Sequence, residues 1–235
     1  MVLPTAHYQQ PTAHYQLTTI NYPLKKYMKK LSLLVLALLA VGAANAQRMG
    51  LNVGYAPQTL VASPNDGDDR AEFHGGFAGL NYNATLSGNI NLSIGAQARF
   101  NFKSEERGPE SAKFTVKYQQ WLVDVPLLLN YTLKAGRDFV IAPFFGPTFS
   151  YGISGKKKYE GDILETEVSR DGEDWYDGDN SPMNRLDVSL TVGLSLNFTD
   201  FRFYGGYNMG LLDLDKSDDI SVKARTWFVG LGYML

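Results

Sequence analysis

The chain has 235 residues, with 22 lysines and arginines against 24 acidic residues, 23 glycines, 14 tyrosines, 13 phenylalanines and no cysteine. The length allows one domain or two small ones, and many aromatic residues and glycines with modest charge favour a sheet protein. The missing cysteine excludes a disulfide framework, a cysteine-based metal site, a thiol nucleophile and a lipid-modified N-terminal cysteine. The near-neutral charge gives no electrostatic case for binding nucleic acid.

The first predicted element is an export signal at residues 28–46. Two lysines after Met28 precede an apolar run that begins at Leu31, and Ala44-Asn45-Ala46 follows as a small-x-small cleavage site. This order of a basic, an apolar and a small-residue segment is typical of a signal peptide. The apolar run is shorter than the roughly 20 residues that a helix needs to span a bilayer, which disfavours a membrane anchor. We expect cleavage before Gln47.

Residues 1–27 precede that signal and contain an internal repeat, in which PTAHYQ at 4–9 recurs at 11–16. An upstream segment of this kind is unusual for an export signal, so we expect translation to begin at Met28, or this extension to be disordered. A metal site made of the repeated histidines and tyrosines is the alternative. Removal of residues 1–46 takes away four lysines and no acid, which leaves 18 basic and 24 acidic residues in a mildly acidic mature chain.

Alternation of apolar and polar residues with period two runs through most of residues 47–235 and predicts strands. It is clearest at 186–198, where the apolar residues from Leu186 to Phe198 share one face and small or polar residues share the other. A helix would scatter both sets around its circumference. The pattern predicts eight strands, at 48–56, 73–86, 89–103, 113–132, 138–154, 185–198, 201–212 and 221–235.

The connections between these strands alternate between long and short. The long, polar ones are 57–72, 104–112, 155–184 and 213–220, and the short turns are 87–88, 134–137 and 199–200. Long loops at one end and tight turns at the other are typical of an up-and-down antiparallel barrel with two different rims. We therefore expect an all-β, eight-stranded antiparallel barrel, with both ends of residues 47–235 at the rim of the short turns.

Alternation alone does not say which face of the barrel points outward. The polar faces of the third, sixth and seventh strands carry few charges and many small residues, which suits a narrow lumen. The apolar faces carry aromatic residues too bulky to fit together inside a small barrel: Phe139, Phe145, Phe149, Tyr151, Phe201, Phe203, Tyr207, Trp227 and Tyr233. Apolar residues outside and small polar residues inside predict a transmembrane barrel. A soluble, lipocalin-like carrier with an apolar cavity is the alternative.

Three prolines, Pro126, Pro143 and Pro147, lie inside predicted strands. Because proline cannot donate to a strand ladder, we expect bulges or register breaks at these positions. The fourth strand also changes the parity of its apolar residues, from even positions before Gln119 to odd positions after Gln120. A register shift near these two glutamines would reconcile the two halves of the strand.

Three of the predicted strands carry recognisable motifs: WLVDVPLLLNY at 121–131, FFGPTFSY at 144–151 and WFVGLGYML at 227–235. They resemble the YLEIPLLLKY strand, the strand that follows it and the closing strand of the PorT-like outer-membrane β-barrel family of Bacteroidetes. Asp124 stands where that family usually has glutamate, and Leu235 where phenylalanine is commoner. The resemblance covers residues 47–235. It implies a Gram-negative cell envelope, insertion by the barrel-assembly machinery and an accessory role in secretion.

Four charged residues share the parity that points into the predicted lumen, and they are Arg99, Asp124, Asp187 and Arg202. Buried charges must be paired to be tolerated, so we expect a lumen charge network that braces the barrel. A proton or ion pathway would use similar residues, and the protein would then be a small channel. Eight strands enclose a lumen that side chains about fill, which favours the bracing role.

His74 is the one histidine of residues 47–235, and we expect it at the outer rim. A lipid-modifying barrel enzyme that uses a serine–histidine pair at the rim is an alternative. No recognisable motif sets a serine beside His74, so we expect no catalytic residue. Asp177 and Asp179 offer oxygen ligands at alternate positions, as calcium loops do, but Pro182 stands where such a loop needs glycine. They are weak candidates for a metal site, and a solvated acidic loop is the expectation.

These observations predict an outer-membrane barrel that has a structural or interaction role through its extracellular loops, chiefly 155–184. We expect it to be no enzyme and to need no cofactor. The expected partners are outer-membrane lipids and lipopolysaccharide, the barrel-assembly machinery, and an extracellular or secretion-system protein, but no nucleic acid. A small channel, a lipid-modifying barrel enzyme and a soluble periplasmic carrier are the alternatives.

Overall fold

The computed structural model describes residues 49–63, 69–108, 114–163, 166–176, 183–215 and 221–235. This part of the chain is built of strands: β1 (Met49–Tyr55), β2 (Gln58–Ser63), β3 (Asp69–Ser87), β4 (Ile90–Arg107), β5 (Phe114–Tyr131), β6 (Leu133–Lys134), β7 (Phe139–Ile163), β8 (Thr166–Asp174), β9 (Leu186–Phe198), β10 (Phe201–Gly210) and β11 (Ser221–Met234). Among the described residues there is no helix long and apolar enough to cross a membrane.

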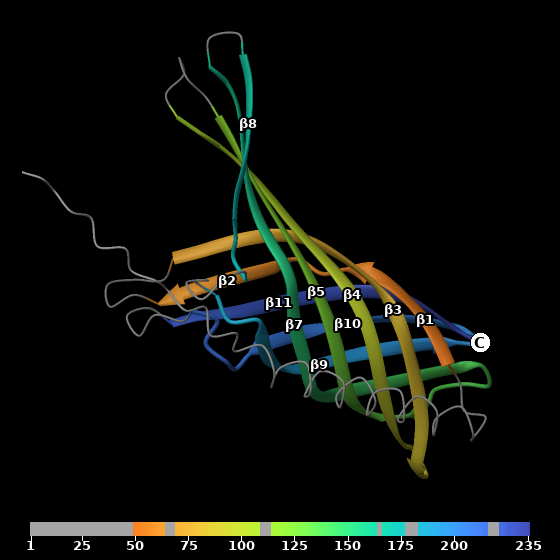
Figure 1. Ribbon diagram of the computed structural model, residues 1–235. Coiled ribbons are helices and arrows are strands. Elements are labelled where there is room, and N and C mark those ends of the chain that lie inside the picture. The colour runs from red at the N-terminus through yellow and green to blue at the C-terminus, as the bar shows by residue number, and fades with distance from the viewer. Residues whose placement is uncertain (1–48, 64–68, 109–113, 164–165, 177–182, 216–220) are drawn as a thin grey trace, which may run out of the picture. The chain divides into compact units, whose positions relative to one another are not determined.

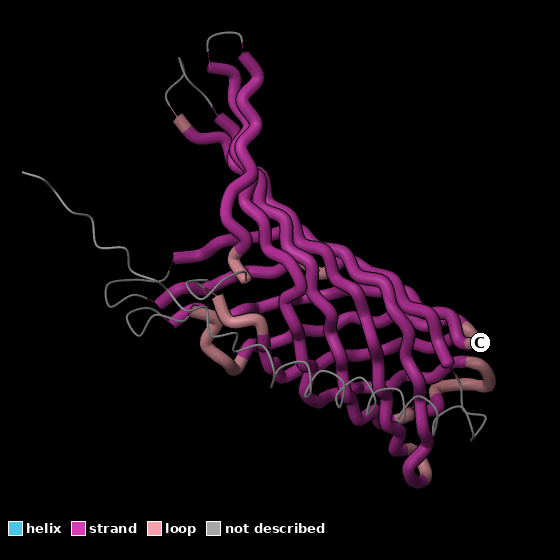
Figure 2. The backbone as a smooth tube through the Cα atoms, viewed as in Figure 1, coloured by secondary structure: helices cyan, strands magenta, loops and turns pink. Residues whose placement is uncertain are grey.

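The strands close into a barrel in which every neighbouring pair is antiparallel (Figure 2). β1 and β2 together occupy one position in the ring, because each of them pairs with β3 on one side and with β11 on the other. The remaining positions follow in chain order as β3, β4, β5, β7, β9, β10 and β11. The ring therefore has eight strand positions, and the prediction of an eight-stranded up-and-down barrel is confirmed.

The strands are strongly staggered around the barrel. The row of paired residues that starts at Asp187 on β9 runs through β7, β5, β4, β3, β1, β11 and β10 and returns to β9 at Asn197. One circuit thus moves ten residues along the same strand, from position 187 to position 197. A stagger of this kind accompanies a strand tilt of roughly 35–45°, and it places residues of one row at different heights in the lumen.

β4, β5 and β7 continue beyond the ring, where β8 joins them, and this part of the sheet rises at the top of Figure 1. We call residues 103–107, 114–119, 156–163 and 166–174 of β4, β5, β7 and β8 the strand extension. β4 pairs with β5 up to Arg107, and β7 turns back into β8. The β3–β4 pairing begins only at His74 and Phe102, so residues 103–107 of β4 form one free edge of this sheet.

Three of the predicted connections contain strand residues and are therefore corrected. Residues 155–184 include the last part of β7 and all of β8, residues 57–72 include β2 and the start of β3, and β4 reaches Arg107. At 104–112 and 155–184 the pattern failed for a physical reason. Above the ring the sheet does not need an apolar face, so its strands need no period-two alternation. In the sequence, such charged strands look the same as polar loops.

The outer surface of the ring is apolar, as predicted. The aromatic residues expected to face outward, from Phe145 to Tyr233, are between about a third and three fifths exposed, with Phe145 at 59%. They gather in two belts. The belt near the long loops holds Tyr55, Phe102, Trp121, Tyr151, Tyr207 and Trp227, and the belt near the short turns holds Tyr131, Phe198, Phe201 and Tyr233. Two such belts around an apolar band are the pattern of membrane-spanning barrels.

The lumen contains large rings as well as the small residues that the sequence predicted. Phe77, Phe144, Tyr204 and Phe228 point inward and lie within 6.3 Å of one another in successive pairs of ring centroids. These four rings fit into the narrow lumen because glycines, which have no side chain, lie opposite them. A Cβ on Gly193 would meet the Phe144 ring, and one on Gly206 or Gly230 would meet Phe228 or Tyr204. The inward glycines therefore make room for aromatic filling rather than for an open channel.

The expected irregularities are only partly where the sequence placed them. β7 carries one extra residue, Ile153, opposite the step from Trp121 to Leu122 of β5. The residues of β5 keep one parity throughout, because Val116 and Tyr118 point inward like Gln120. A register shift therefore lies one residue after the predicted position, between Trp121 and Leu122, but the extra residue is on β7. The expected change of parity within β5 does not occur, and the inward apolar residues pack in the mouth of the barrel.

Among the three prolines, a break in the ladder follows Pro126. Leu127 and Leu128 of β5 have no ladder partner opposite Gly146 and Pro147. Gly146 adopts a φ of 157°, and a Cβ on it would lie 2.1 Å from the Leu127 carbonyl oxygen. On its other side β7 runs in regular register with β9 through both Pro143 and Pro147. The chain accommodates these two prolines without shifting that pairing.

Gly193→Ala is expected to destabilise the barrel by about 1–3 kcal/mol, because its added methyl overpacks the lumen. The new Cβ would lie 2.3 Å from Phe144 Cζ and 2.4 Å from the Gly205 carbonyl oxygen. Gly76→Ala is the matched control, since its Cβ would meet nothing nearer than 3.6 Å. Urea unfolding of the refolded barrel in lipid vesicles measures both. Equal midpoints for the two variants would contradict the proposed packing.

Candidate functional site

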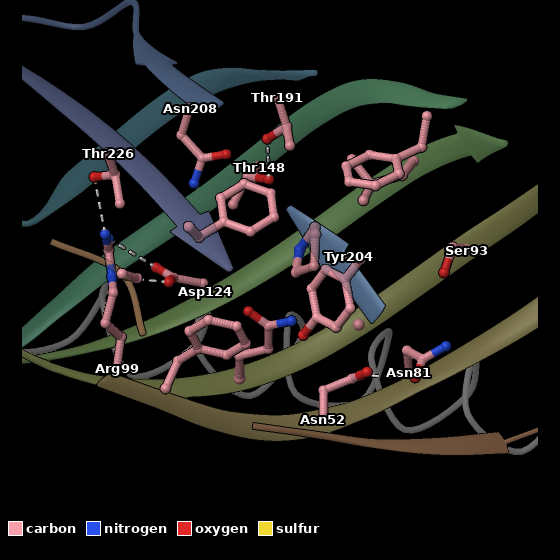
Figure 3. A pocket seen from close by; sticks show the side chains of 18 of the residues that line it. Asn52, Asn81, Ser93, Arg99, Asp124, Thr148, Thr191, Tyr204, Asn208 and Thr226 are labelled. Carbon is pink, nitrogen blue, oxygen red and sulfur yellow. Dashed lines mark hydrogen bonds and ion pairs between the residues drawn. The ribbon is translucent and has the colours of Figure 1, made fainter. Parts of the chain in front are cut away.

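A buried ion pair lies in the lumen. Arg99 Nε is 3.0 Å from Asp124 Oδ2, and Arg99 Nη2 donates to Asp124 Oδ1 at 3.2 Å. The third corner of the guanidinium, Nη1, donates to Thr226 Oγ1 at 3.2 Å on the opposite wall (Figure 3). Both charged residues are at most 5% exposed. Because β4, β5 and β11 supply these groups, the pair ties distant parts of the ring together.

The structure brings together two of the four charged residues that the sequence assigned to the lumen. Asp187 lies on the same row as Asp124, with Ser150 between them, and the charge of Arg99 acts on it without forming an ion pair. Arg202 pairs with Asn197 close to the turn between β9 and β10. All four are buried, but Arg202 is separated from the others along the lumen by the stagger of the strands.

A layer of amides lies next to this ion pair, toward the long loops. Asn101 Nδ2 donates to the Gln58 side-chain oxygen and, at 3.0 Å, to Gln120 Oε1. Gln120 Nε2 in turn donates to the Tyr176 hydroxyl at 2.5 Å. These side chains are at most 5% exposed. A network of this kind ties residues of three strands, β2, β4 and β5, to Tyr176 after β8, because each buried amide would otherwise lose a hydrogen bond.

Two aromatic residues close the mouth of the barrel at the long-loop end, and we call Trp175 and Tyr176 the aromatic plug. The Trp175 backbone N–H donates to the Gly155 carbonyl at 2.7 Å, and its ring lies 6.2 Å from Phe73. Tyr176 packs directly over Gly152, where a Cβ would lie 2.4 Å from the ring. Arg185 donates to the Tyr176 carbonyl and holds the segment in place.

The sequence reasoning missed the aromatic plug because Trp175 and Tyr176 lie among the acidic residues of 155–184. Two signals were available. One is a pair of aromatic residues in an otherwise charged segment, and the other is Gly152 and Gly155 in the last part of an aromatic-rich strand. Glycines on an inward face indicate that a ring approaches closely.

The middle of the lumen, next to the ion pair, holds little free space. A cavity of about 60 Å³ lies among the inward rings, lined by Asn52, Asn81, Thr148, Tyr204 and Asn208 among others (Figure 3). Asn52 donates to Asn81 at 2.7 Å, and the hydroxyls of Thr148 and Thr191 are 2.6 Å apart. A volume of this size accommodates a few water molecules and no larger solute.

His74 lies on the outer surface, in the belt near the long loops. Its Nδ1 is 2.6 Å from the Tyr55 hydroxyl, and its ring packs beside Phe102. Among the described residues no group of three or more histidine, cysteine, aspartate or glutamate side chains could hold a metal ion. The weak metal candidates Asp177 and Asp179 lie outside the described residues.

The strand extension carries a charged cluster on its free edge. Glu105 accepts from Lys103 at 2.5 Å and from Arg107 at 2.8 Å. The hydrogen bonds from Lys103 and Arg107 hold the pKa of Glu105 below its ordinary value, so the cluster persists at mildly acidic pH and is lost only as the pH falls through that lowered pKa. On the same face Lys157 Nζ lies 4.9 Å from the Tyr159 ring centroid.

A closed antiparallel barrel with an apolar, aromatic-belted exterior and a polar, filled lumen defines the class of membrane-spanning β-barrels. A family model described as the outer membrane protein beta-barrel domain matches residues 31–234. The chain belongs to this family, and it is an outer-membrane β-barrel protein. No curated protein matches it significantly.

The chain is also similar to several solved structures of outer-membrane barrels. Ail, the attachment invasion locus protein of Yersinia pestis, is 16% identical over 80% of this chain and 99% of its own, with a TM-score of 0.40. Neisserial surface protein A is 11% identical over 78% and 96%, with a TM-score of 0.35. The outer membrane protease OmpT from Escherichia coli is 8% identical over 81% and 98%, with a TM-score of 0.36.

Proposed function

We propose that this protein is a closed outer-membrane barrel whose strand extension binds a protein outside the cell. The observation that carries the proposal is the contrast between its two parts. The lumen is obstructed by the aromatic plug, by the amide layer and by the Arg99–Asp124 pair with the rings below it. The strand extension, in contrast, offers a sheet with unpaired backbone groups at the edge of β4.

The edge of β4 suits pairing with a strand of another protein. Main-chain hydrogen bonds along residues 103–107 would give affinity, and the alternating side chains would give specificity. Lys103, Glu105 and Arg107 lie on one face of this edge and Ser104 and Glu106 on the other. Charges at a free edge also discourage unselective sheet aggregation, so the edge favours a charged, matching partner.

The resemblance to PorT-like barrels supports a partner that belongs to a secretion system, or an extracellular protein. It also supports residues 28–46 as a signal peptide cleaved before Gln47, with insertion by the barrel-assembly machinery into a membrane that contains lipopolysaccharide. We infer no enzymatic activity and no cofactor. His74, the candidate of a lipid-modifying enzyme, contacts the Tyr55 hydroxyl through Nδ1 on the lipid-facing surface.

Two measurements on the refolded protein test this proposal. In planar bilayers the wild-type barrel is expected to show no conductance above background, because its lumen is filled. Steady conductance would favour the small channel.

For the second measurement, residues 157–173 are replaced by Asn-Gly, which joins Lys156 to Asp174 across a two-residue turn where they already pair.

The shortened variant keeps the barrel and removes most of β8. It is expected to retain the shift in gel mobility on boiling that folded membrane barrels show, because a closed ring has no edge from which SDS can unfold it. A photo-crosslinker at Ser104 should give a discrete protein adduct on cells carrying the full chain. The adduct should weaken in the shortened variant, because the ends of β4 and β5 would remain as a two-stranded hairpin, which is marginally stable without further strands. The same crosslinker at Ala135, in a short turn, is the control. The absence of a discrete adduct at Ser104, or an equal adduct at Ala135, would refute binding by the strand extension.

A further inference from the structure

We propose that the lumen holds an anion-binding site at the short-turn end, centred on Arg202. The site takes a small soluble anion with planar or tetrahedral oxygens, such as a carboxylate or a phosphate. The inference is independent of the role of the strand extension, because the two features lie at opposite ends of the barrel.

The site is a hollow of about 450 Å³ that is separate from the smaller central cavity. Thr132, Asp138 and Thr199, which lie in or beside the short turns, line its entrance, and Ser195 and Asn197 line its wall. Arg202 lines both this hollow and the central cavity, so it lies at the boundary between them. The hollow is thus open at the short-turn rim and closed by Arg202 at its inner end.

Arg202 is a buried cation without an anionic partner. It is 8% exposed, its Nε has no hydrogen-bond partner, and among the described residues no carboxylate lies within ion-pair distance of it. Arg99, in contrast, has Asp124 at 3.0 Å and the further charge of Asp187 nearby. An unpaired buried charge is costly, so an anion bound at Arg202 would supply the negative charge that the lumen does not provide.

Two aromatic rings lie beside the Arg202 guanidinium. The Cζ atom lies 5.7 Å from the Phe144 ring centroid and 5.1 Å from that of Tyr204. Rings bind the faces of a guanidinium and leave the N–H donors at its edge free. Those donors form a fixed fork that matches carboxylate and phosphate oxygens. The rings therefore hold the fork in place for a ligand.

The other polar residues around the hollow are consistent with an anion that enters from the short-turn rim and binds Arg202. Asp138 is the other charged residue of its lining, and it is exposed at the entrance. The amides farther in are engaged within the protein, since Asn197 donates to Ser195 and Asn91 donates to Thr132 at 2.6 Å. Arg202 is therefore the principal free donor, and Asp138 should weaken binding through repulsion.

Calorimetry with inorganic phosphate and with citrate, on the refolded barrel in a non-ionic detergent, tests the site. Saturable binding of either anion is expected, and Arg202→Gln should weaken it at least about tenfold, which corresponds to roughly 1.4 kcal/mol. Arg202→Lys should retain part of the affinity, because the charge stays and the fork is lost. Asp138→Asn should strengthen binding.

Arg137→Gln is the matched control, because Arg137 is exposed in the neighbouring turn and does not line the hollow. It should bind both anions as the wild type does. Each variant must first show the mobility shift on boiling, which establishes that it is folded. The absence of saturable binding to the wild type would overturn the proposal, and so would equal binding by Arg202→Gln or an equal loss in Arg137→Gln.

Discussion

Arg99→Gln is expected to destabilise the folded barrel by about 3–5 kcal/mol, the usual effect of breaking a buried ion pair from one side. The substitution removes the cation that faces Asp124 at 3.0 Å and that also acts on Asp187. Two buried carboxylates would then share one region of the lumen with no positive charge between them. Urea unfolding in lipid vesicles, followed by tryptophan fluorescence, measures the loss.

The matching change on the acidic side should have a smaller effect. Asp124→Asn leaves Arg99 with the charge of Asp187 and with its hydrogen bond to Thr226. In the double variant the two losses should fail to add, with a coupling energy of about 0.5–3 kcal/mol. Arg137→Gln, at an exposed turn, should change stability by less than about 0.5 kcal/mol. If Asp124→Asn proved as damaging as Arg99→Gln, Asp187 would have no part in the arrangement.

The sequence predicted the ring of strands well because the membrane imposes one rule on all of them. A strand of the ring must turn an apolar face to lipid, so period two appears along most of the ring. The short β2 (Gln58–Ser63) is the ring strand that the pattern missed. The same rule explains the failure at 155–184. The strand extension lies outside the ring, and the residues of β8 there follow no alternation that would distinguish a strand from a polar loop.

The candidate site could be predicted only as a set of residues. The odd or even position of a residue along its strand assigned four charged residues to the lumen: Arg99, Asp124, Asp187 and Arg202. It does not give the height of each residue along the barrel axis. The height depends on the register of every strand pair, and the stagger of ten residues per circuit separates Arg202 from the other three although a single row connects it to Asp187. The charge network that the sequence suggested is therefore an ion pair with one acidic neighbour and, farther down, a lone cation.

The last prediction concerns which rim faces the outside of the cell, and its effect should be all or none. The chain has no cysteine, so a single introduced thiol reports its position without background. Ser104 is exposed on the strand extension and Ala135 is exposed in a short turn. Because short turns of membrane barrels face the periplasm, a bulky polyethylene-glycol maleimide should label Ser104→Cys on intact cells. It should label Ala135→Cys only after the outer membrane is opened.

A third position separates folding from orientation. Ser195 is 1% exposed and faces the lumen, so Ser195→Cys should resist the bulky reagent until the barrel is boiled in SDS. Labelling of Ala135→Cys but not Ser104→Cys on intact cells would show that the barrel has the opposite orientation in the membrane. The strand extension would then meet periplasmic proteins, and the hollow at Arg202 would meet anions of the surrounding medium. The labelling pattern therefore decides which partners and which anions each end of the barrel can reach.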